Sequence, residues 1–157
     1  MSLFGLNLVL AFMWAFATGS LSEVNLVIGF GVGMVVLHFV GGALGDRRYA
    51  VRFVRVVGLF LFFLRELALS SVRVAVDVLR PRLRAQPAVI AVPLDLTTDA
   101  QITLLANLIS LTPGTLSIDV AADKSCLYVH AMFADDPERL VRDIKSSFER
   151  RILEVFR

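Results

Sequence analysis

The first 45 residues almost lack charged side chains, because Glu23 is their single Asp, Glu, Lys or Arg. A helix needs an uncharged stretch of about 20 residues to cross a hydrocarbon core of roughly 30 Å. Residues 1–22 and 24–45 each reach that length. The whole chain is 57% hydrophobic, whereas a soluble domain is typically about 45–50% apolar. The sequence therefore excludes an ordinary soluble protein and predicts a membrane anchor.

Cysteine is nearly absent too, since Cys126 is the single cysteine in 157 residues. One cysteine excludes an internal disulfide and a cysteine-based zinc site, and it fits a reducing compartment. The N-terminus lacks the basic region that begins a cleaved signal peptide, and a second apolar segment follows closely. We therefore expect residues 1–22 to be retained in the membrane and the polar half of the chain to be cytoplasmic.

The motifs of common enzymes are also missing. The sequence has no nucleophile elbow, Walker loop, metal-ligand cluster or paired catalytic carboxylates, and His130 stands alone on a predicted strand. We predict no enzyme activity, no cofactor and no metal. The nine Arg of residues 46–86 alternate with Phe, Leu and Val at helical spacing, which favours lipid headgroups over nucleic acid as their partners.

The charge pattern divides the chain into three predicted parts: a transmembrane helical hairpin (1–45), an amphipathic juxtamembrane helix with a basic linker (46–86), and a cytoplasmic α/β domain (87–157). The hairpin turn around Gly19 contains no Lys or Arg, whereas Arg47 and Arg48 follow the second span. By the positive-inside rule, both ends of the hairpin should lie in the cytoplasm.

The helix predicted after the hairpin, over residues 48–80, carries its polar side chains on one narrow stripe. On a helical wheel they fall within an arc of about 80°. They are Arg48, Arg52, Arg55, Glu66, Ser70, Arg73, Asp77 and Arg80. Such a helix suits the cytoplasmic membrane interface, where its polar edge stays wet. The alternative is a third transmembrane helix whose stripe faces protein, and the pattern alone leaves it open.

Beyond the linker the periodicities predict a small domain of β-α-β-β-α order. Strands are expected at 88–94, 115–120 and 126–133. A capping box from Thr98 to Gln101 opens the first helix, and Asp136 with Pro137 opens the last. Both helices should cover one face of the sheet, because a domain of this size has one small core.

Two groups of residues are candidates for a functional role. His38, inside the second span, and Glu66, beside Arg65, are candidate proton-relay groups because intramembrane ionisable side chains are costly. The simpler interpretations are a structural histidine and a solvated or ion-paired Glu66. Gly29, Gly33, Gly41 and Gly45 form a small-residue stripe that predicts close helix packing, either inside the hairpin or against another subunit.

A longer tract carries a resemblance. Residues 106–120 read Ala-Asn-Leu-Ile-Ser-Leu-Thr-Pro-Gly-Thr-Leu-Ser-Ile-Asp-Val, and Leu-Tyr-Val-His follows at 127–130. Together with Thr18-Gly19-Ser20 at the hairpin turn and Asp77-Val-Leu-Arg-Pro81, this pattern resembles the E subunit of the multisubunit Mrp-type cation/proton antiporters. The resemblance extends over the whole chain.

The resemblance implies an accessory or assembly subunit of a monovalent cation (Na⁺)/proton antiporter in the bacterial inner membrane. It implies other subunits and membrane lipids as partners, and it transfers no catalytic residue to this chain. In that family, ion movement is attributed mainly to the large subunits. The alternative from another class is a membrane-tethered regulatory module whose α/β domain binds a small ligand or a partner protein.

Overall fold

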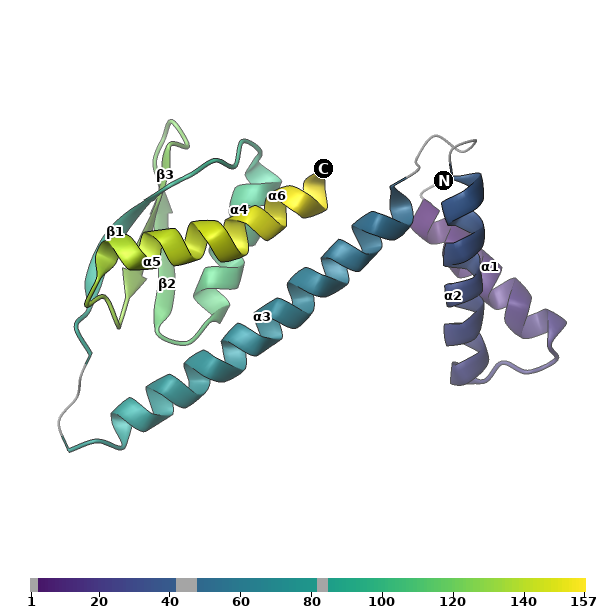
Figure 1. Cartoon of the computed structure of the whole chain (residues 1–157), viewed down its shortest axis with the longest axis horizontal. Helices are drawn as coiled ribbons and strands as arrows, with labels where there is room; N and C mark the ends of the chain where they lie inside the picture. The colour runs from purple at the N-terminus through teal and green to yellow at the C-terminus, as the bar shows by residue number, and fades with distance from the viewer. Residues whose placement is uncertain (1–2, 42–47, 82–84) are drawn as a thin grey trace. The chain divides into compact units, whose positions relative to one another are not determined.

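The computed structural model describes residues 3–41, 48–81 and 85–157 (Figure 1). The chain divides into two compact units, Met1–Val54 and Arg55–Arg157, which we describe separately as the N-terminal and C-terminal units. The division falls within one long helix, α3 (Tyr49–Val78). The three parts predicted from the sequence have other boundaries, and that domain division stays a prediction.

The N-terminal unit is built on two packed helices, α1 (Leu3–Ala17) and α2 (Glu23–Val40). The chain between them turns at Gly19, whose φ of +69° is a conformation that glycine adopts without strain. Ser22 then caps α2, because its side-chain oxygen accepts a hydrogen bond from the Asn25 N–H at 3.3 Å. This short run of small and polar residues is the turn that the sequence predicted.

The two helices of the N-terminal unit differ in length. Among the described residues, α2 is the one helix that is long enough and apolar enough to cross a membrane, with 18 residues. The apolar helix α1 has 15 residues, fewer than the roughly 20 that a perpendicular span needs. The predicted two-span hairpin is therefore represented by one candidate membrane helix and one shorter apolar helix.

The C-terminal unit contains the predicted three strands in one antiparallel sheet. They are β1 (Ala88–Pro93), β2 (Thr115–Val120) and β3 (Cys126–Ala131), in the spatial order β1-β3-β2. β1 lies at an edge and ends at Pro93, a position where a missing N–H is tolerated. The β2–β3 register shifts between Ser117 and Asp119, so the alternation of side chains changes face there.

Local sequence signals account for the helix ends in this unit. α4 (Asp99–Leu111) begins with the predicted capping box, in which Thr98 and Gln101 each bond the other's backbone. After α4, Gly114 has a φ of +89°, as the third position of a type II turn requires. Asp136 caps α5 (Pro137–Ile144), whose first residue is proline. These three predictions are confirmed.

The last helix is not the single regular α-helix that we expected. A π-helical turn, η1 (Lys145–Glu149), connects α5 to α6 (Arg150–Phe156). Ile144, Phe148 and Ile152 are spaced by four residues, as on one face of an amphipathic helix. All three are buried across the π-helical turn, and Glu149 within that turn is buried as well.

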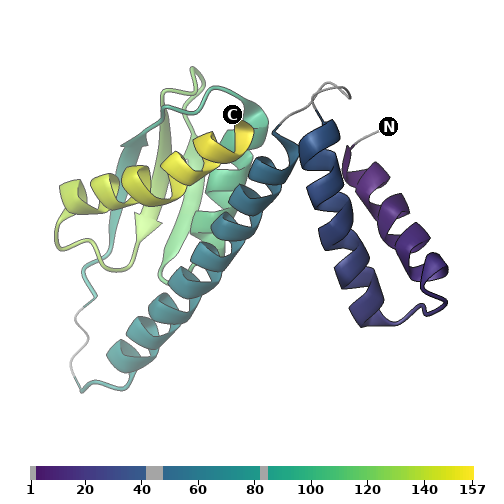
Figure 2. The ribbon, with the colours of Figure 1, turned by 45° about the vertical axis from the view of Figure 1, so that its right-hand side comes forward.

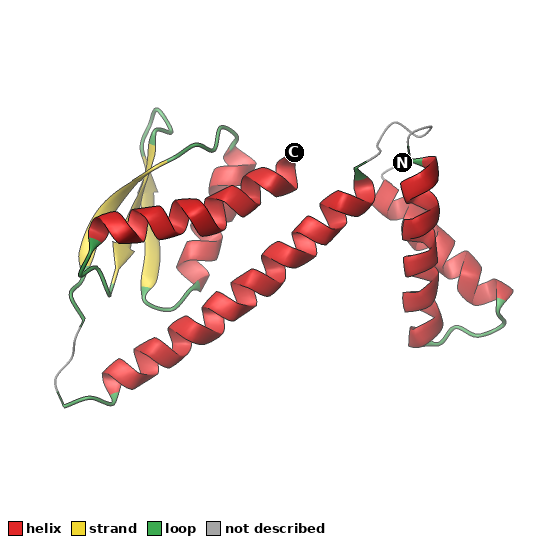
Figure 3. Cartoon of the chain, in the orientation of Figure 1, coloured by secondary structure: helices red, strands yellow, loops and turns green. Residues whose placement is uncertain are grey.

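The core of the C-terminal unit lies between the sheet and its helices. Side chains of α4 and of α5–α6 join Val92, Leu127 and Val129 of the strands in one cluster, so these helices cover the same face of the sheet (Figure 3). The opposite face carries exposed apolar side chains: Val89, Leu116, Ile118 and Tyr128. An uncovered apolar face of this kind is typical of a protein that functions within an assembly.

The part of α3 in the C-terminal unit runs beside this domain (Figure 2). Leu59 belongs to the core, and the Phe62 ring meets Phe148 edge-on at a centroid distance of 5.2 Å. Ser70 and Asp77 are buried on the same side of the helix, at 9% and 3% exposure. The expectation that the polar edge of this helix stays wet is therefore wrong for these two residues, which are buried within the unit.

The outward face of α3 is apolar over the same stretch. Its exposed large side chains include Phe60, Leu61, Leu64, Leu69, Val72 and Val76. Several of them are more than half exposed, with Leu61 at 59% and Val72 at 62%. Arg65, whose side chain is 67% exposed, lies among them. This part of α3 therefore buries Ser70 and Asp77 against its own domain and presents a predominantly apolar face outward, which favours an apolar environment on that side.

Candidate functional site

Inside the N-terminal unit, one polar side chain is enclosed by the packed helices. Asn7 of α1 is fully buried, and its Nδ2 donates to the Tyr49 hydroxyl at 3.0 Å. Tyr49 is the first residue of α3, 42 positions along the chain. Because buried polar groups are costly unless they are bonded, this hydrogen bond specifies how the start of α3 meets α1.

The glycines of α2 make room for that arrangement. A Cβ atom added at Gly33 would collide with the Asn7 side-chain oxygen, and one added at Gly29 would lie 2.8 Å from the Ala11 carbonyl oxygen and from Trp14 Cβ. Both glycines therefore face α1. Of the two packing partners that the sequence left open for these positions, the structure provides the one inside the hairpin, since α1 fills the space beside them.

The other two glycines of the predicted stripe have different surroundings. Gly41 is buried and follows α2 as its C-terminal cap, with its N–H donating to the Leu37 carbonyl at 2.7 Å. Gly45 lies outside the described residues. A packing interface that includes Gly41 and Gly45 stays a prediction.

The two candidate proton-relay residues have ordinary environments. His38 is exposed near the end of α2, where its ring meets the neighbouring Phe39 ring edge-on at 5.6 Å. Glu66 is partly buried on α3 and pairs with its neighbour Arg65 at 2.7 Å. They belong to different units, and neither adjoins a described chain of ionisable groups of the kind that carries protons.

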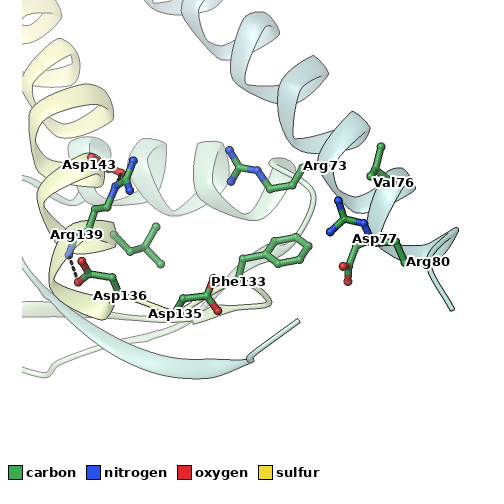
Figure 4. Close-up of a pocket in the computed structure, with 10 residues that line it drawn as sticks. Arg73, Val76, Asp77, Arg80, Phe133, Asp135, Asp136, Arg139 and Asp143 are labelled. Carbon is green, nitrogen blue, oxygen red and sulfur yellow. Dashed lines mark hydrogen bonds and ion pairs between the residues drawn. The ribbon is translucent and has the colours of Figure 1, made fainter. Parts of the chain in front are cut away.

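A charged cleft of about 530 Å³ opens where the end of α3 approaches the β3–α5 loop and α5 (Figure 4). Three arginines and four aspartates line it, together with Val76, Phe133 and Leu140. The charged lining residues are Arg73, Asp77, Arg80, Asp135, Asp136, Arg139 and Asp143.

Some of the charged side chains of this cleft are engaged with one another. Asp136 is engaged as the cap of α5, accepting from the Arg139 N–H at 2.9 Å, and the Arg139 side chain lies 3.8 Å from Asp143. The lining residues include no Ser, Thr, Cys or His. Across the described part of the chain, no three His, Cys, Asp or Glu side chains form a group suited to a metal ion.

The most enclosed charge in the C-terminal unit is the Glu149 carboxylate, which is 1% exposed. One of its oxygens accepts from the Asp95 N–H at 2.6 Å, and the other lies 3.1 Å from the Lys145 ammonium. Lys145 also reaches the Asp95 carboxylate at 2.9 Å and donates to the Pro93 carbonyl at 2.9 Å. This network joins the last helix to the end of β1.

The carboxylates decide the protonation of Lys145. Partial burial, the largest single influence, would lower the pKa of its ammonium. Hydrogen bonds and charges from Asp95 and Glu149 together outweigh burial and raise that pKa above its ordinary value. Lys145 therefore keeps its charge, and the buried Glu149 keeps a partner, in neutral and moderately alkaline solution.

The residues predicted from the sequence to have a role did not include Asn7, Tyr49 or Glu149. Asn7 carried a usable signal, since a polar amide within a long uncharged run is unusual in a membrane segment. Glu149 had none, because a Glu among the charged residues of an amphipathic helix is ordinarily solvated. Its burial comes with partners in the fold, since the Asp95 N–H and the Lys145 ammonium lie against its carboxylate.

The sequence matches known proteins over nearly its whole length. A family described as a Na⁺/H⁺ ion antiporter subunit matches residues 7–155. The E subunit of a Na⁺/H⁺ antiporter of Alkalihalophilus pseudofirmus is 41% identical over 150 residues, which is 96% of this chain and 95% of the relative. The corresponding E subunit of Bacillus subtilis is 40% identical over 152 residues, covering 97% of this chain and 96% of that protein.

Solved structures of similar fold come from membrane complexes. A chain of the Mrp complex from Dietzia sp. has a TM-score of 0.50 at 26% identity, covering 66% of this chain and 97% of that chain. A chain of the membrane-bound sulfane sulfur reductase, an archaeal respiratory membrane complex, has a TM-score of 0.61 at 25% identity. The match covers 99% of this chain and 100% of that chain. With a matching family model and close relatives along its whole length, this chain belongs to the family of Na⁺/H⁺ antiporter E subunits.

Proposed function

We propose that this chain is an accessory subunit of a multisubunit monovalent cation/proton antiporter in the bacterial inner membrane, required for assembly rather than for moving ions. The observation that carries the proposal is the near-complete match to antiporter E subunits. Its own residues support the accessory role, because the hairpin segment 3–41 contains only two ionisable side chains, Glu23 and His38. A transport path through a membrane protein is ordinarily built from several polar or ionisable groups.

The proposed placement puts the 1–45 hairpin in the membrane, α3 along the cytoplasmic surface, and residues 87–157 in the cytoplasm. The outward apolar face of α3 supports an interfacial position, as does the burial of Ser70 and Asp77 on the opposite side. A spanning α3 would carry its charges through lipid at roughly 2.5–3.5 kcal/mol for each central Arg or Asp, unless protein neighbours compensated.

Deleting this subunit from the operon tests the accessory role. We expect the remaining subunits to assemble poorly, so that everted membrane vesicles lose Na⁺-dependent proton exchange and regain it when the intact chain is supplied. Purification of the complex through a tag on another subunit would measure the assembly directly. Full assembly and normal exchange without this chain would contradict the proposal and favour the tethered regulatory module.

The first prediction concerns His38. His38→Gln keeps hydrogen-bonding capacity but removes the ionisable imidazole. Because the ring is exposed and packs beside the Phe39 ring in the described structure, we expect unchanged Na⁺/H⁺ exchange at every pH tested. His130→Gln, on β3, is the matched control. An assembled complex that loses exchange only with His38→Gln would instead make this residue a proton relay.

The second prediction concerns topology. Ser20→Cys, made in a Cys126→Ser background, places one thiol in the hairpin turn, and the unaltered chain offers Cys126 of β3 as its one thiol. An impermeant thiol reagent applied to intact cells should label position 20 and leave Cys126 unlabelled until the cells are opened. Labelling of both positions in intact cells would mean that α3 crosses the membrane.

A further inference from the structure

A second cleft, of about 250 Å³, lies on the C-terminal unit between the beginning of its α3 segment and α6. Its lining is predominantly basic, with three arginines and one glutamate. The lining residues are Arg55, Gly58, Leu59, Arg150, Arg151 and Glu154. We refer to it as the basic cleft. An excess of guanidinium groups around a concave surface favours an anionic ligand.

Two of the arginines are held in place by contacts within the C-terminal unit. Arg55 donates from one terminal nitrogen to the Glu154 backbone carbonyl at 2.7 Å. The Arg151 guanidinium lies 4.0 Å above the centre of the Phe62 ring. A guanidinium carries five N–H donors, and these contacts leave most of them for another partner. The two side chains are therefore preorganised to bind one anion between them.

The third arginine is the most weakly held member of the basic cleft. Arg150 is 65% exposed and lies 3.7 Å from the Glu154 carboxylate, which is itself 45% exposed. An ion pair of this length and exposure contributes little to stability. Glu154 is thus a weak internal competitor for Arg150, and an entering anion can replace it.

Gly58 provides the opening. A Cβ atom at this position would meet no atom within 4 Å, so the packing of this chain does not require glycine. Glycine inside a helix costs about 1 kcal/mol relative to alanine. Val57 and Leu61, one residue before Gly58 and three after it, are exposed apolar side chains on α3. The basic cleft therefore opens beside the apolar face of the helix.

We propose that the basic cleft binds the phosphate of an anionic phospholipid, with the acyl chains of that lipid lying against the outward face of α3. Arg55 and Arg151 bind the phosphate oxygens, Arg150 closes over them, and Gly58 admits the glycerol backbone. The proposal rests on the interfacial placement of α3 proposed above. It assigns the membrane contact of this subunit to a particular lipid site rather than to general surface charge.

Titration of the full chain with a short-chain lipid tests the site directly. The ¹⁵Nε–H resonances of Arg55, Arg150 and Arg151 would be followed in zwitterionic micelles while dihexanoyl phosphatidylglycerol is added. Dihexanoyl phosphatidylcholine, which has a phosphate but no net charge, is the comparison. We expect saturable shifts of these resonances with phosphatidylglycerol alone. Absence of saturable shifts would overturn the proposal.

Four variants separate a lipid site from a general charge effect. Each basic residue near a membrane surface changes binding by about fivefold, so Arg150→Gln should weaken phosphatidylglycerol binding by about that factor. Glu154→Gln should strengthen it, because the competing carboxylate is lost while the backbone carbonyl that holds Arg55 remains. Gly58→Leu should block binding sterically without changing charge. Arg142→Gln, an exposed arginine of α5 with the same charge change, should have no effect.

Two further measurements separate a lipid phosphate from free phosphate, and the lipid site from the proposed interfacial placement of α3. Inorganic phosphate that shifts the same resonances at lower concentrations than the lipid would make the ligand a free phosphate and contradict a lipid site. A spin label at Leu61 reports separately whether α3 reaches lipid. A buried label without saturable binding defeats the lipid site alone, whereas a water-exposed label defeats the interfacial placement as well. Equal weakening by Arg142→Gln and Arg150→Gln would also contradict the site.

Discussion

Gly33→Leu is expected to separate α1 from α2 and to be among the most damaging single changes in the N-terminal unit. The new side chain would enter the space of the Asn7 amide. Overpacking of this kind costs about 1–3 kcal/mol. Displacement of Asn7 would also break its hydrogen bond to Tyr49, and an orphaned buried polar group costs a further 1–3 kcal/mol or so. Thermal unfolding of the full chain in detergent and the yield of the antiporter complex both measure the loss.

Gly31→Leu is the matched control for this experiment. It makes the same change two residues away, at a position where an added Cβ meets no atom within 4 Å. We expect the Gly31 variant to unfold at nearly the normal temperature. If both variants behave alike, lipid exposure or helix propensity is responsible, and the close approach of α2 to Asn7 is not. If Gly31→Leu alone impairs assembly, that face of α2 contacts another subunit.

Glu149→Ala should be the most destabilising charge removal in the C-terminal unit. It leaves the Asp95 N–H without its acceptor and Lys145 without its buried partner. Removing one member of a buried ion pair typically costs about 3–5 kcal/mol, because the other charge remains desolvated. Chemical denaturation of the full chain, followed by circular dichroism, would measure the change in the free energy of unfolding.

Glu138→Ala provides the comparison within the same unit. Glu138 also pairs with a basic residue four positions away, Arg142 at 3.5 Å, but its side chain is exposed. Such a pair contributes at most about 1 kcal/mol. Equal effects of the two substitutions would show that Glu149 is solvated in solution. Glu149→Gln should fall between them, since the amide oxygen can still accept from Asp95.

Much of the fold follows from local rules that can be read along the chain. The capping box at Thr98, the proline and cap that open α5, and the glycine of the turn after α4 each depend on neighbours within four residues. The strand positions follow from alternation, and the apolar hairpin follows from composition. Family membership came from a long specific tract of sequence rather than from any of these physical signals.

The features that could be predicted along the chain were therefore local: the elements, their caps, the polar stripe of α3 and, through the long tract, the family. The burial of Ser70 and Asp77 on that stripe depends on tertiary packing, since the domain that covers them begins after the linker. Tertiary packing also decided the Asn7–Tyr49 bond and the Glu149–Asp95 bond, which join residues 42 and 54 positions apart. From sequence alone, a polar side chain is predicted to be solvated. Whether it is buried with a partner depends on desolvation and hydrogen bonding, which are set by neighbours in space rather than in sequence.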